Sequence, residues 1–331
     1  MFVPKVNGFY VSPGTFIIDA KRSMKSRFKL YKKQAPIEKV AGKPVLAPHN
    51  SQTLISDAVS LGKPFAAGRL GTVEGDIIWW RIRNPKRIIP AALLGNGKNL
   101  AGIFPASQSA VLEFADVYMD SVGNLDLLGV RNQDFFSGYY RMESEVVERT
   151  NPSMLCSIDA FSPLGLTDSW VKALSGKRVL VIHPFSSTIQ SQYQKNRREI
   201  FPDKDWLPDF NLQVYRPFQT AGPNISDARA TTWKNALDIM LDDVSKLTFD
   251  VALISAGAYG LPLATGIKDT GRIAIHIGGV LQLFFGIRGG RWDPVSKDYP
   301  FLSRYQSDAW VRPSKNETPE WGRLVEGGAY W

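Results

Sequence analysis

The second half of the chain alternates short apolar runs with amphipathic segments, and this pattern allows few architectures. Three runs are typical of buried strands: Arg178–Ile182, Asp250–Ile254 and Arg272–Ile277. Helical patterns lie around them at Ser186–Arg198, Ser226–Leu247, Tyr259–Lys268 and Val280–Phe285. Continuous apolar strands separated by helices pair in parallel through right-handed crossovers. The sequence therefore predicts an α/β protein with a Rossmann-like, mostly parallel sheet and helices on both faces.

The first half adds elements of the same kind. Strands are predicted at Pro64–Arg69 and Leu125–Val130, and helices at Gly71–Arg83, Pro105–Val122 and Gly138–Glu148. Residues 1–60 show no clear period, and Gly42–Asn50 is predicted to be a connector. We divide the chain into an N-terminal extension with a basic segment (1–60), a Rossmann-like catalytic domain (61–292) and a C-terminal tail (293–331). The apolar end of this tail is expected to dock on the domain.

Composition narrows the class of protein. The chain has 331 residues, 44% of them hydrophobic, and one cysteine, Cys156. A single cysteine excludes an internal disulfide framework and a cysteine-based zinc site. We see neither a signal peptide nor an apolar stretch long enough to span a membrane. These features predict a soluble, cytoplasmic protein.

The net charge of +9 is concentrated in one place. Lys21–Lys33 holds most of it and contains no acidic residue, while apolar residues such as Phe28 lie among the cations. Such a segment is either a solvated basic arm or a contact to an anionic membrane surface, which would place the protein at the inner face of the membrane. Contact with nucleic acid is a further alternative that we do not expect.

Three strand ends of the second half are candidate ligand sites, because ligands of open α/β sheets lie outside the carboxyl ends of the strands. The first contains His183, Ser186 and Ser187. Its hydroxyl groups and helix N-terminus suit a phosphate, or Ser186 is a plain helix cap.

The second strand end contains Gly257, Tyr259 and Gly260. The glycines permit close approach of a ligand to the backbone. Tyr259 is placed either to stack on a base or sugar or to pack under the helix. The spacing matches neither the dinucleotide fingerprint nor a P-loop, so NAD and FAD are not predicted, and the separated histidines give no indication of haem.

The third strand end contains His276, Gly278 and Gly279. A histidine inside a strand is often a satisfied core residue, but its place before two glycines also suits catalysis. Arg288 and Arg291 follow, and both suit phosphate or carboxylate.

The first half has one acidic cluster after a predicted strand, with Arg69, Gly71, Thr72, Glu74 and Asp76. A carboxylate at such a turn can hold a divalent cation, Mn²⁺ or Mg²⁺, that is bound to a nucleotide diphosphate. It can also act as a base, or simply favour the start of the helix through the helix dipole.

The segment Gly68-Arg-Leu-Gly-Thr-Val-Glu74 resembles the Arg-Phe-Gly-Asp-Gly-Glu segment of GT-D-type glycosyltransferases. Leu253–Ala264 and Ala274–Gly278 look like the late Rossmann-type repeat of that family, and the second half is similar to uncharacterised proteins of bacterial surface-polysaccharide gene clusters. The resemblance implies transfer of a sugar from a nucleotide-sugar donor, with a metal held through Asp-x-Glu. Here Thr72 stands in place of the Asp, and Asp76 is the one nearby substitute.

The leading hypothesis is therefore a glycosyltransferase of polysaccharide or glycan biosynthesis, acting on a glycan or lipid-linked acceptor. Glu74 would be the base or the metal contact, and His276 or His183 would bind diphosphate or polarise the acceptor. Arg69 would neutralise phosphate or orient Glu74. Two alternatives stay open: an enzyme of another phosphate ligand, such as a sugar phosphate, and a non-catalytic scaffold with a degenerate site.

Overall fold

A computed structural model describes residues 5–6, 9–10, 38–131, 138–164, 166, 168–222, 229–293, 305–324 and 328–331. The basic segment Lys21–Lys33 lies outside these residues, so its proposed contacts stay predictions. Within the described part of the chain, no helix combines the length and apolarity needed to cross a membrane.

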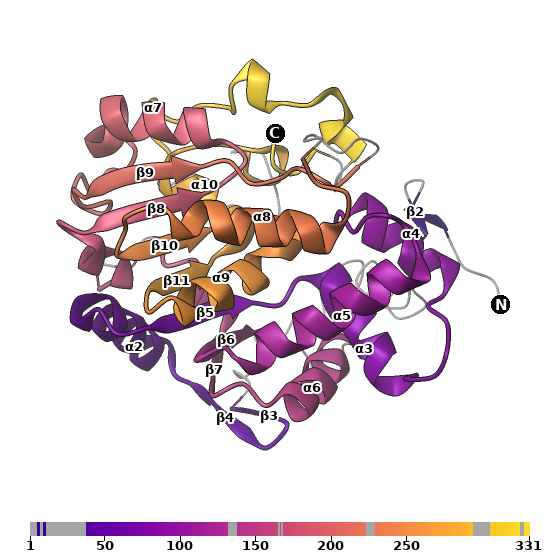
Figure 1. Cartoon of the computed structure of the whole chain (residues 1–331). Helices are drawn as coiled ribbons and strands as arrows, with labels where there is room; N and C mark the ends of the chain where they lie inside the picture. Colours follow the sequence, from indigo (N-terminus) through magenta and orange to yellow (C-terminus); the bar gives the residue numbers. More distant parts are fainter. Residues whose placement is uncertain are drawn as a thin grey trace, which may run out of the picture.

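The centre of the fold is a nine-stranded sheet in the order β3-β4-β7-β6-β5-β11-β10-β8-β9 (Figure 1). The strands are β3 (Lys39–Val40), β4 (Lys43–Leu46), β5 (Phe65–Arg69), β6 (Leu127–Val130), β7 (Met154–Ser157), β8 (Arg178–Ile182), β9 (Asn211–Tyr215), β10 (Val251–Ile254) and β11 (Ile273–His276). β3 is antiparallel to β4, and the other pairs are parallel. A separate antiparallel pair joins β1 (Lys5–Val6) to β2 (Phe9–Tyr10). The mostly parallel α/β sheet predicted from the sequence is confirmed.

Helices cover both faces of the sheet. The α-helices are α2 (Pro48–Leu61), α3 (Thr72–Arg83), α4 (Ala91–Asn99), α5 (Gln108–Gly123), α6 (Gly138–Thr150), α7 (Ser186–Asn196), α8 (Trp233–Ser245), α9 (Gly260–Asp269) and α10 (Leu281–Phe284). The short 3₁₀ helices are η1 (Ile158–Phe161), η2 (Trp170–Leu174), η3 (Arg197–Glu199), η4 (Gly257–Tyr259), η5 (Gly278–Val280), η6 (Gly290–Trp292), η8 (Lys315–Glu317) and η9 (Glu320–Leu324).

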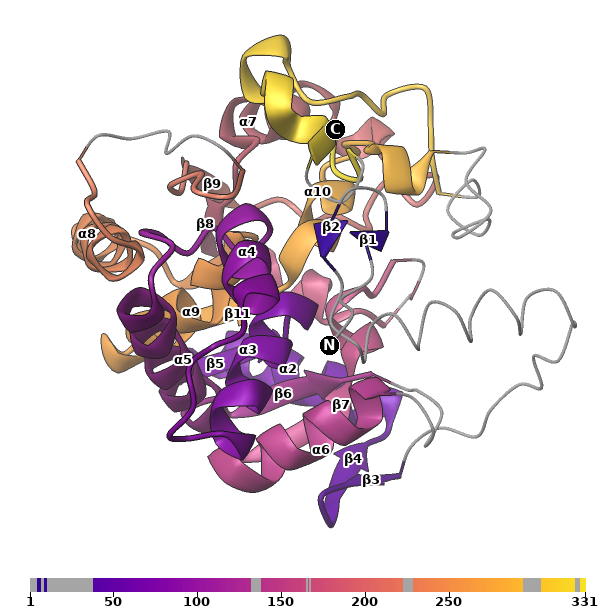
Figure 2. The ribbon, with the colours of Figure 1, turned by 90° about the vertical axis from the view of Figure 1, so that its right-hand side faces the viewer.

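The strands divide their side chains between two cores. In β8, Leu180 and Ile182 face the core shared with α3, α5, α6, α8 and α9, whereas Val179 and Val181 face the core shared with α2, α7 and α10. Figure 2 shows α5, α8 and α9 together on one side of the sheet. Because both faces are covered, both sets of strand side chains are apolar, which explains the continuous apolar runs in the sequence.

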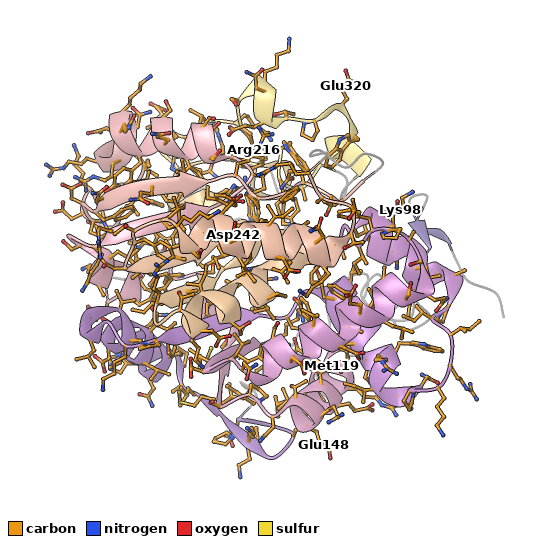
Figure 3. The ribbon with its side chains drawn as sticks, viewed as in Figure 1. Lys98, Met119, Glu148, Arg216, Asp242 and Glu320 are labelled. Carbon is orange, nitrogen blue, oxygen red and sulfur yellow. The ribbon has the colours of Figure 1, made fainter. Side chains whose placement is uncertain are left out.

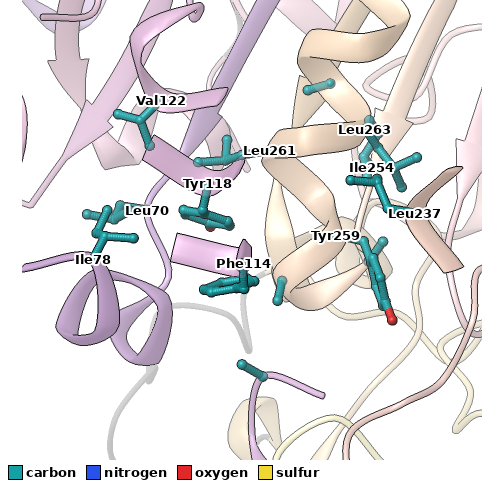
Figure 4. Close-up of a cluster of buried hydrophobic side chains, with 14 of the residues drawn as sticks. Leu70, Ile78, Phe114, Tyr118, Val122, Leu237, Ile254, Tyr259, Leu261 and Leu263 are labelled. Atoms are coloured by element: carbon teal, nitrogen blue, oxygen red, sulfur yellow. The ribbon is translucent and has the colours of Figure 1, made fainter. Parts of the chain in front are cut away.

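Helix α5 connects the two halves of the first core. Its Phe114 and Tyr118 lie between Leu70 and Ile78 on one side and Leu237 and Tyr259 on the other (Figure 4). The ring of Phe114 also meets the ring of Trp233 edge-on, with 4.8 Å between centroids. This packing fixes the end of β5 relative to α9, and both contribute to the candidate site.

Helix α8 shows the predicted apolar stripe but a different start. Trp233, Leu237 and Met240 are buried, and Asp242 on the outward side (Figure 3) pairs with Lys246 at 2.6 Å. The predicted start at Ser226 is wrong for the described residues that precede the helix. Helix α8 begins at Trp233, because the Oγ1 of Thr232 accepts a hydrogen bond from the backbone N–H of Asn235 at 3.0 Å and caps it.

Two predicted boundaries in the first half of the chain are also wrong. Helix α5 begins at Gln108 rather than at Pro105, because the hydroxyl of Ser107 caps it by accepting from the N–H of Ala110. The predicted connector Gly42–Asn50 contains β4, which pairs in parallel with β7, and the start of α2. Residues assigned from the sequence to the N-terminal extension thus contribute to the main sheet.

Candidate functional site

A cavity of about 320 Å³ lies at the carboxyl ends of β5, β11, β10 and β8. Helix α9 follows β10 on one face of the sheet while α7 follows β8 on the other, and α3 and α10 diverge in the same way after β5 and β11. Connections that leave adjacent strands toward opposite faces open a crevice between them. The cavity occupies these crevices, so its place agrees with the rule used on the sequence.

The structure brings together eleven of the residues singled out in the sequence. Those that line the cavity are Arg69, Gly71, Thr72, Glu74, His183, Gly257, Tyr259, His276, Gly278, Gly279 and Arg291. Five others do not line it: Asp76, Ser186, Ser187, Gly260 and Arg288. The reason differs from residue to residue and is given below.

His183 is held in one protonation state by its own loop. It follows β8, is 2% exposed, and its Nδ1 accepts a hydrogen bond from the backbone N–H of Phe185 at 2.9 Å. The proton of the neutral ring is therefore assigned to Nε2. Burial lowers the pKa of His183 to about 3, so the ring stays neutral near pH 7. Nε2 has no hydrogen-bond partner among the described residues.

His276 is the second buried imidazole of the cavity. Burial, and then the nearby charge of Arg69, lower its pKa to about 3. A Cβ atom built on Gly260 would lie 2.0 Å from the Cε1 atom of His276. Gly260 is therefore small because it makes room for the imidazole, and its predicted role in ligand approach is wrong. The Nδ1 atom of His276 has no partner within the described part of the chain.

Arg69 and Glu74 come from the end of β5 and the start of α3. The carboxylate of Glu74 folds back over the helix N-terminus, since a Cβ on Gly71 would lie 2.0 Å from its Oε2. That position suits an anion, because the N–H groups of the first helical turn point toward it. Glu74 also lines the cavity, so the catalytic or metal-binding role considered from the sequence stays a prediction beside this structural one.

An ion pair behind this turn was missed in the sequence. Arg131 follows β6, and its guanidinium pairs with Glu143 of α6 at 2.5 Å. The same guanidinium donates to the carbonyl oxygen of Leu70 at 2.9 Å and to the hydroxyl of Thr72 at 3.4 Å. Burial raises the pKa of Glu143, and the charge of Arg131 counteracts it. The available signal was a basic residue directly after an apolar strand, the same placement that singled out Arg69.

Tyr118 is a further cavity residue without a signal in the sequence. Its spacing in α5 marks it as a core residue, and its ring is buried. Burial, and then the charge of Glu74, raise its pKa well above the ordinary value. The phenol therefore stays protonated, and it forms a hydrogen bond with the backbone of Gly71.

The glycines at the strand ends have different neighbours. Gly257 has a φ of +52°, and a Cβ built on it would meet nothing within 4 Å. Gly278 lies beneath the side chain of Arg69. Gly279 accommodates Tyr330, whose Cε1 atom would lie 2.2 Å from an added Cβ. Of the glycines Gly257, Gly260, Gly278 and Gly279, Gly257 alone has open space at its Cβ position, as close approach by a ligand requires.

Tyr259 packs in the core rather than presenting a ring to a ligand. Its ring stacks on that of Trp233 at 5.2 Å between centroids and 8° between planes, and its hydroxyl hydrogen-bonds the hydroxyl of Thr220 at 2.9 Å. Burial raises its pKa. The packing alternative considered for Tyr259 describes this geometry, while its edge still lines the cavity.

The predicted phosphate site at Ser186 and Ser187 is wrong, because the start of α7 already holds an anion. The carboxylate of Glu317 accepts hydrogen bonds from the backbone N–H of Ser187 at 2.8 Å and of Thr188 at 3.2 Å. The Oγ of Ser314 donates to the same carboxylate at 2.9 Å. Glu317 is 5% exposed, so it occupies the position that a phosphate would need.

Arg288 and Asp76 also lie away from the cavity. The Nη2 of Arg288 donates to the carbonyl oxygen of Trp310 at 2.8 Å, and its backbone N–H donates to Val311 at 2.7 Å. This arginine therefore supports the C-terminal segment, and its predicted contact with phosphate is wrong. Asp76 is on α3 one turn from the cavity, and it does not face the space that Glu74 lines.

The C-terminal segment forms one wall. Arg291, Trp321, Tyr330 and Trp331 line the cavity. The backbone N–H of Gly290 donates to the carbonyl oxygen of Trp331 at 3.0 Å, and that of Arg291 donates to Ala329 at 3.1 Å. Arg291 lies over the ring of Tyr330, with 5.2 Å to its centroid. Aromatic rings at a cavity wall suit the planar base of a nucleotide or the face of a sugar ring.

The residues present do not fit a divalent metal held by the protein through Asp-x-Glu. Glu74 is the one acidic side chain among the described residues that line the cavity. Thr72 occupies the position of the expected Asp, and its hydroxyl already lies beside the cationic guanidinium of Arg131. Among the described residues, no group of three or more His, Cys, Asp or Glu side chains is placed to hold a metal ion.

Comparison with known proteins gives a limited result. No protein-family model matches the sequence, and no curated protein matches it. Three solved chains are similar to the structure. A new glycosyltransferase (DUF1792) from Streptococcus sanguinis is 13% identical, with a TM-score of 0.43, over 72% of this chain and 82% of that one.

The two other solved chains have lower TM-scores. A structure described as the highly conserved domain of unknown function 1792, with a distinct glycosyltransferase fold, is 11% identical, with a TM-score of 0.38, over 71% of this chain and 83% of that one. A selenomethionine substituted structure of the same domain is 13% identical, with a TM-score of 0.37, over the same shares. Two of these descriptions name a glycosyltransferase, the class of enzyme that the sequence resembles. Since these TM-scores are below 0.5, the functional proposal rests on the cavity.

Proposed function

We propose that this protein is a glycosyltransferase that takes its sugar from a nucleotide-sugar donor. One observation carries the proposal: the imidazole of His183 lines the cavity at the strand ends, and its buried Nε2–H has no hydrogen-bond partner in the described part of the chain. A buried donor without an acceptor costs stability, so its presence fits a ligand that supplies the acceptor atom. Phosphate oxygens are such atoms, and the open backbone at Gly257 and the charge of Arg69 suit them too.

The dimensions of the cavity support a ligand with two linked parts. His183 follows β8 and Glu74 follows β5, and these strands are separated by β10 and β11 in the sheet. Three strand spacings amount to about 14 Å. A diphosphate near His183 and Gly257 would therefore leave room for a sugar toward Glu74. The aromatic wall at Trp321 and Trp331 is available for the base.

The proposed reaction uses residues at both ends of this space. The hydroxyl oxygen of the acceptor forms a bond to the anomeric carbon while the bond from that carbon to the donor phosphate oxygen breaks. The proton of the hydroxyl passes to the carboxylate of Glu74, which acts as the general base. The nucleoside diphosphate leaves with the electron pair, and the charge of Arg69 stabilises it.

The cellular setting is a second part of the proposal. We place the reaction in polysaccharide or glycan assembly, on a glycan or lipid-linked acceptor, with the basic segment Lys21–Lys33 contacting an anionic membrane surface. Sedimentation with vesicles of phosphatidylcholine alone or with added phosphatidylserine measures this contact. We expect binding to the anionic vesicles only, and its loss when the lysines and arginines of the segment are changed to glutamine. Equal recovery with both vesicles would refute the membrane contact.

Turnover of nucleotide sugars tests the enzyme function. Wild type, Glu74→Gln and the control Glu113→Gln, on the exposed side of α5, are compared for hydrolysis or transfer with UDP-, GDP- and CMP-sugars. We expect turnover by the wild type and the control, and a loss of about 10²-fold or more in Glu74→Gln. Full activity of Glu74→Gln would remove this residue from the mechanism. Binding of simple sugar phosphates, but of no nucleotide, would favour the enzyme of another phosphate ligand.

A further inference from the structure

We infer that the cavity binds the diphosphate of its donor without a divalent metal, with Arg69 and Arg291 supplying positive charge and His183 a neutral hydrogen bond. The inference rests on the proposed function, and it departs from the metal that the glycosyltransferase resemblance implies. It depends on one carboxylate, two arginines and one imidazole that line the cavity, and on Arg131, which contacts Thr72 from behind the turn.

The described lining of the cavity lacks the pair of carboxylate ligands that a divalent metal site of this kind needs. Mg²⁺ and Mn²⁺ bound to nucleotides are held by carboxylates together with phosphate oxygens. Within the part of the chain that the structure describes, Glu74 is the one acidic side chain that lines the cavity, and its carboxylate is folded over Gly71 at the start of α3. Asp76, the candidate second ligand, does not reach the cavity wall. The two carboxylates therefore do not face one common point.

A cation already occupies the place beside Thr72. The Nη2 of Arg131 lies 3.4 Å from the Oγ1 of Thr72 and 2.9 Å from the carbonyl oxygen of Leu70. Its ion pair with Glu143, whose side chain is 4% exposed, holds the guanidinium there. The guanidinium therefore already engages the carbonyl oxygen of Leu70 and the hydroxyl of Thr72, the two oxygen atoms that this turn could offer to a divalent ion.

Two arginine side chains line the cavity elsewhere. Arg69 ends β5, and its aliphatic stem lies over Gly278. Arg291 reaches the cavity from η6 and lies over the rings of Trp292 and Tyr330, at 5.7 and 5.2 Å from their centroids. Guanidinium groups bind phosphate oxygens through paired, charge-assisted hydrogen bonds. Among the described side chains that line the cavity, two are arginines and one is a carboxylate, and this balance suits a diphosphate.

His183 adds a directed contact to this charge. Its ring lines the cavity, and its buried Nε2–H has no partner among the described residues, while the N–H of Phe185 fixes the ring from the other side. A neutral donor of this kind fits a phosphate oxygen and would not bind a metal ion, because Nε2 carries the proton. The imidazole therefore points to an anion at this end of the cavity.

Calorimetry of metal-free protein tests the inference. Wild-type protein is stripped with a chelator, and binding of UDP, GDP and inorganic pyrophosphate is measured in EDTA, in Mg²⁺ and in Mn²⁺. We expect at least one of these ligands to bind in EDTA, with a Kd within about threefold of the value in either metal. Binding that needs Mg²⁺ or Mn²⁺ would overturn the inference, and so would the absence of binding in all three conditions.

Variants separate the arginines from general charge effects. Arg69→Gln and Arg291→Gln are each expected to weaken metal-free binding by about tenfold or more. Arg198→Gln is the matched control, because Arg198 pairs with Asp205 at 3.8 Å on the exposed side of η3 and lies outside the cavity. Unchanged thermal midpoints show that the variants fold. Equal affinity in all four proteins would remove the arginines from the site.

The two proposals fail in different ways. Sugar transfer that occurs only with Mn²⁺ or Mg²⁺, with matching metal-dependent binding, would retain the glycosyltransferase and refute metal-free recognition. Metal-free binding of pyrophosphate that depends on Arg69 and Arg291, without transfer of any sugar, would retain the diphosphate site and refute the transferase.

Discussion

The backbone N–H of Phe185 donates to the Nδ1 of His183 at 2.9 Å and thereby assigns the proton of the ring to Nε2. Replacing His183 with asparagine keeps a short side chain that can accept from Phe185 but removes the group at the Nε2 position. We expect His183→Asn to weaken the binding of a nucleoside diphosphate by about tenfold or more, the value of one buried hydrogen bond to a charged group. Titration calorimetry measures the change.

The matched variant is His183→Gln, whose longer side chain places an amide N–H near the original Nε2. Affinity closer to that of the wild type in His183→Gln than in His183→Asn would support a directed hydrogen bond. If both variants bind as tightly as the wild type, Nε2 is not a ligand contact, and the observation that carries the proposed function is lost.

The two buried imidazoles also predict a dependence of stability on pH. In the unfolded chain a histidine gains a proton as the pH falls through about 6.5. In the folded protein His183 and His276 stay neutral down to about pH 3. Between these values the unfolded state binds more protons, so the free energy of unfolding decreases as the pH falls. Each histidine contributes up to about 1.4 kcal/mol per pH unit.

Urea unfolding at several pH values between 6.5 and 5 measures this slope. His183→Asn is expected to reduce it, whereas His49→Asn, which changes an exposed histidine of α2, is expected to leave it unchanged. A slope identical in all three proteins would show that His183 ionises equally in the folded and unfolded states.

The carboxylate of Glu317 at the start of α7 gives a third prediction. It accepts from the N–H groups of Ser187 and Thr188 in a buried position. Glu317→Ala leaves these donors without an acceptor, and we expect it to destabilise the protein by about 3 kcal/mol, with a smaller loss in Glu317→Gln. Glu320→Ala, an exposed change nearby (Figure 3), is the control. Thermal unfolding measures both effects. If Glu317→Ala is as stable as the wild type, the start of α7 would again be a candidate binding site for an anion.

The long apolar runs of the sequence carried most of the information on the fold. β8, β10 and β11 were predicted closely because each is buried on both sides, which gives a continuous apolar signal. β3 and β4 were missed, since strands of two and four residues are too short to show a period. The start of α8 was misplaced because the cap at Thr232 is a local contact that the apolar pattern does not mark.

The residues of the candidate site that follow directly after the strands could be predicted, because the order of the strands decides where they lie. His183, Gly257 and His276 follow neighbouring parallel strands, so their convergence follows from strand order. Glu317 could not be placed, because it lies 130 residues from Ser187 and no pattern links the two segments. Tyr330 was hidden for the same reason. Contacts between segments that are distant in sequence depend on the packing of the complete chain. The contact of Glu317 with the start of α7 and that of Tyr330 with Gly279 were therefore visible only in the structure.

The contact between Gly279 and Tyr330 is tested by a double-mutant cycle. A Cβ at position 279 would lie 2.2 Å from the Tyr330 ring, so Gly279→Ala is expected to displace the C-terminal wall and cost about 1–3 kcal/mol. In a Tyr330→Ala background the same change should cost about 0.5 kcal/mol or less, because the ring that it meets is gone. Gly95→Ala, at an open position of α4, is the control. Additive costs in urea unfolding would contradict the contact.

Alanine variants of Gly257 and Gly176 separate an effect on the stability of the protein from an effect on ligand binding. It has a positive φ of +52° and open space around the missing Cβ, at the end of β10. Gly176 has a φ of +69° and equally open surroundings, but it lies outside the cavity. An alanine in the left-handed region costs about 1–2 kcal/mol, so Gly257→Ala and Gly176→Ala should destabilise the protein by similar amounts.

The two variants should differ in ligand affinity. The Cβ of Gly257→Ala enters the space that the proposed diphosphate needs to approach the backbone, and we expect binding of UDP or GDP to weaken by about tenfold or more, the loss of one charge-assisted hydrogen bond. Gly176→Ala should bind as the wild type does. Because backbone strain is common to both variants, a difference in affinity can be assigned to the side chain in the cavity. Equal affinities would mean that the ligand does not approach Gly257, and the diphosphate would then have to be placed nearer Arg69.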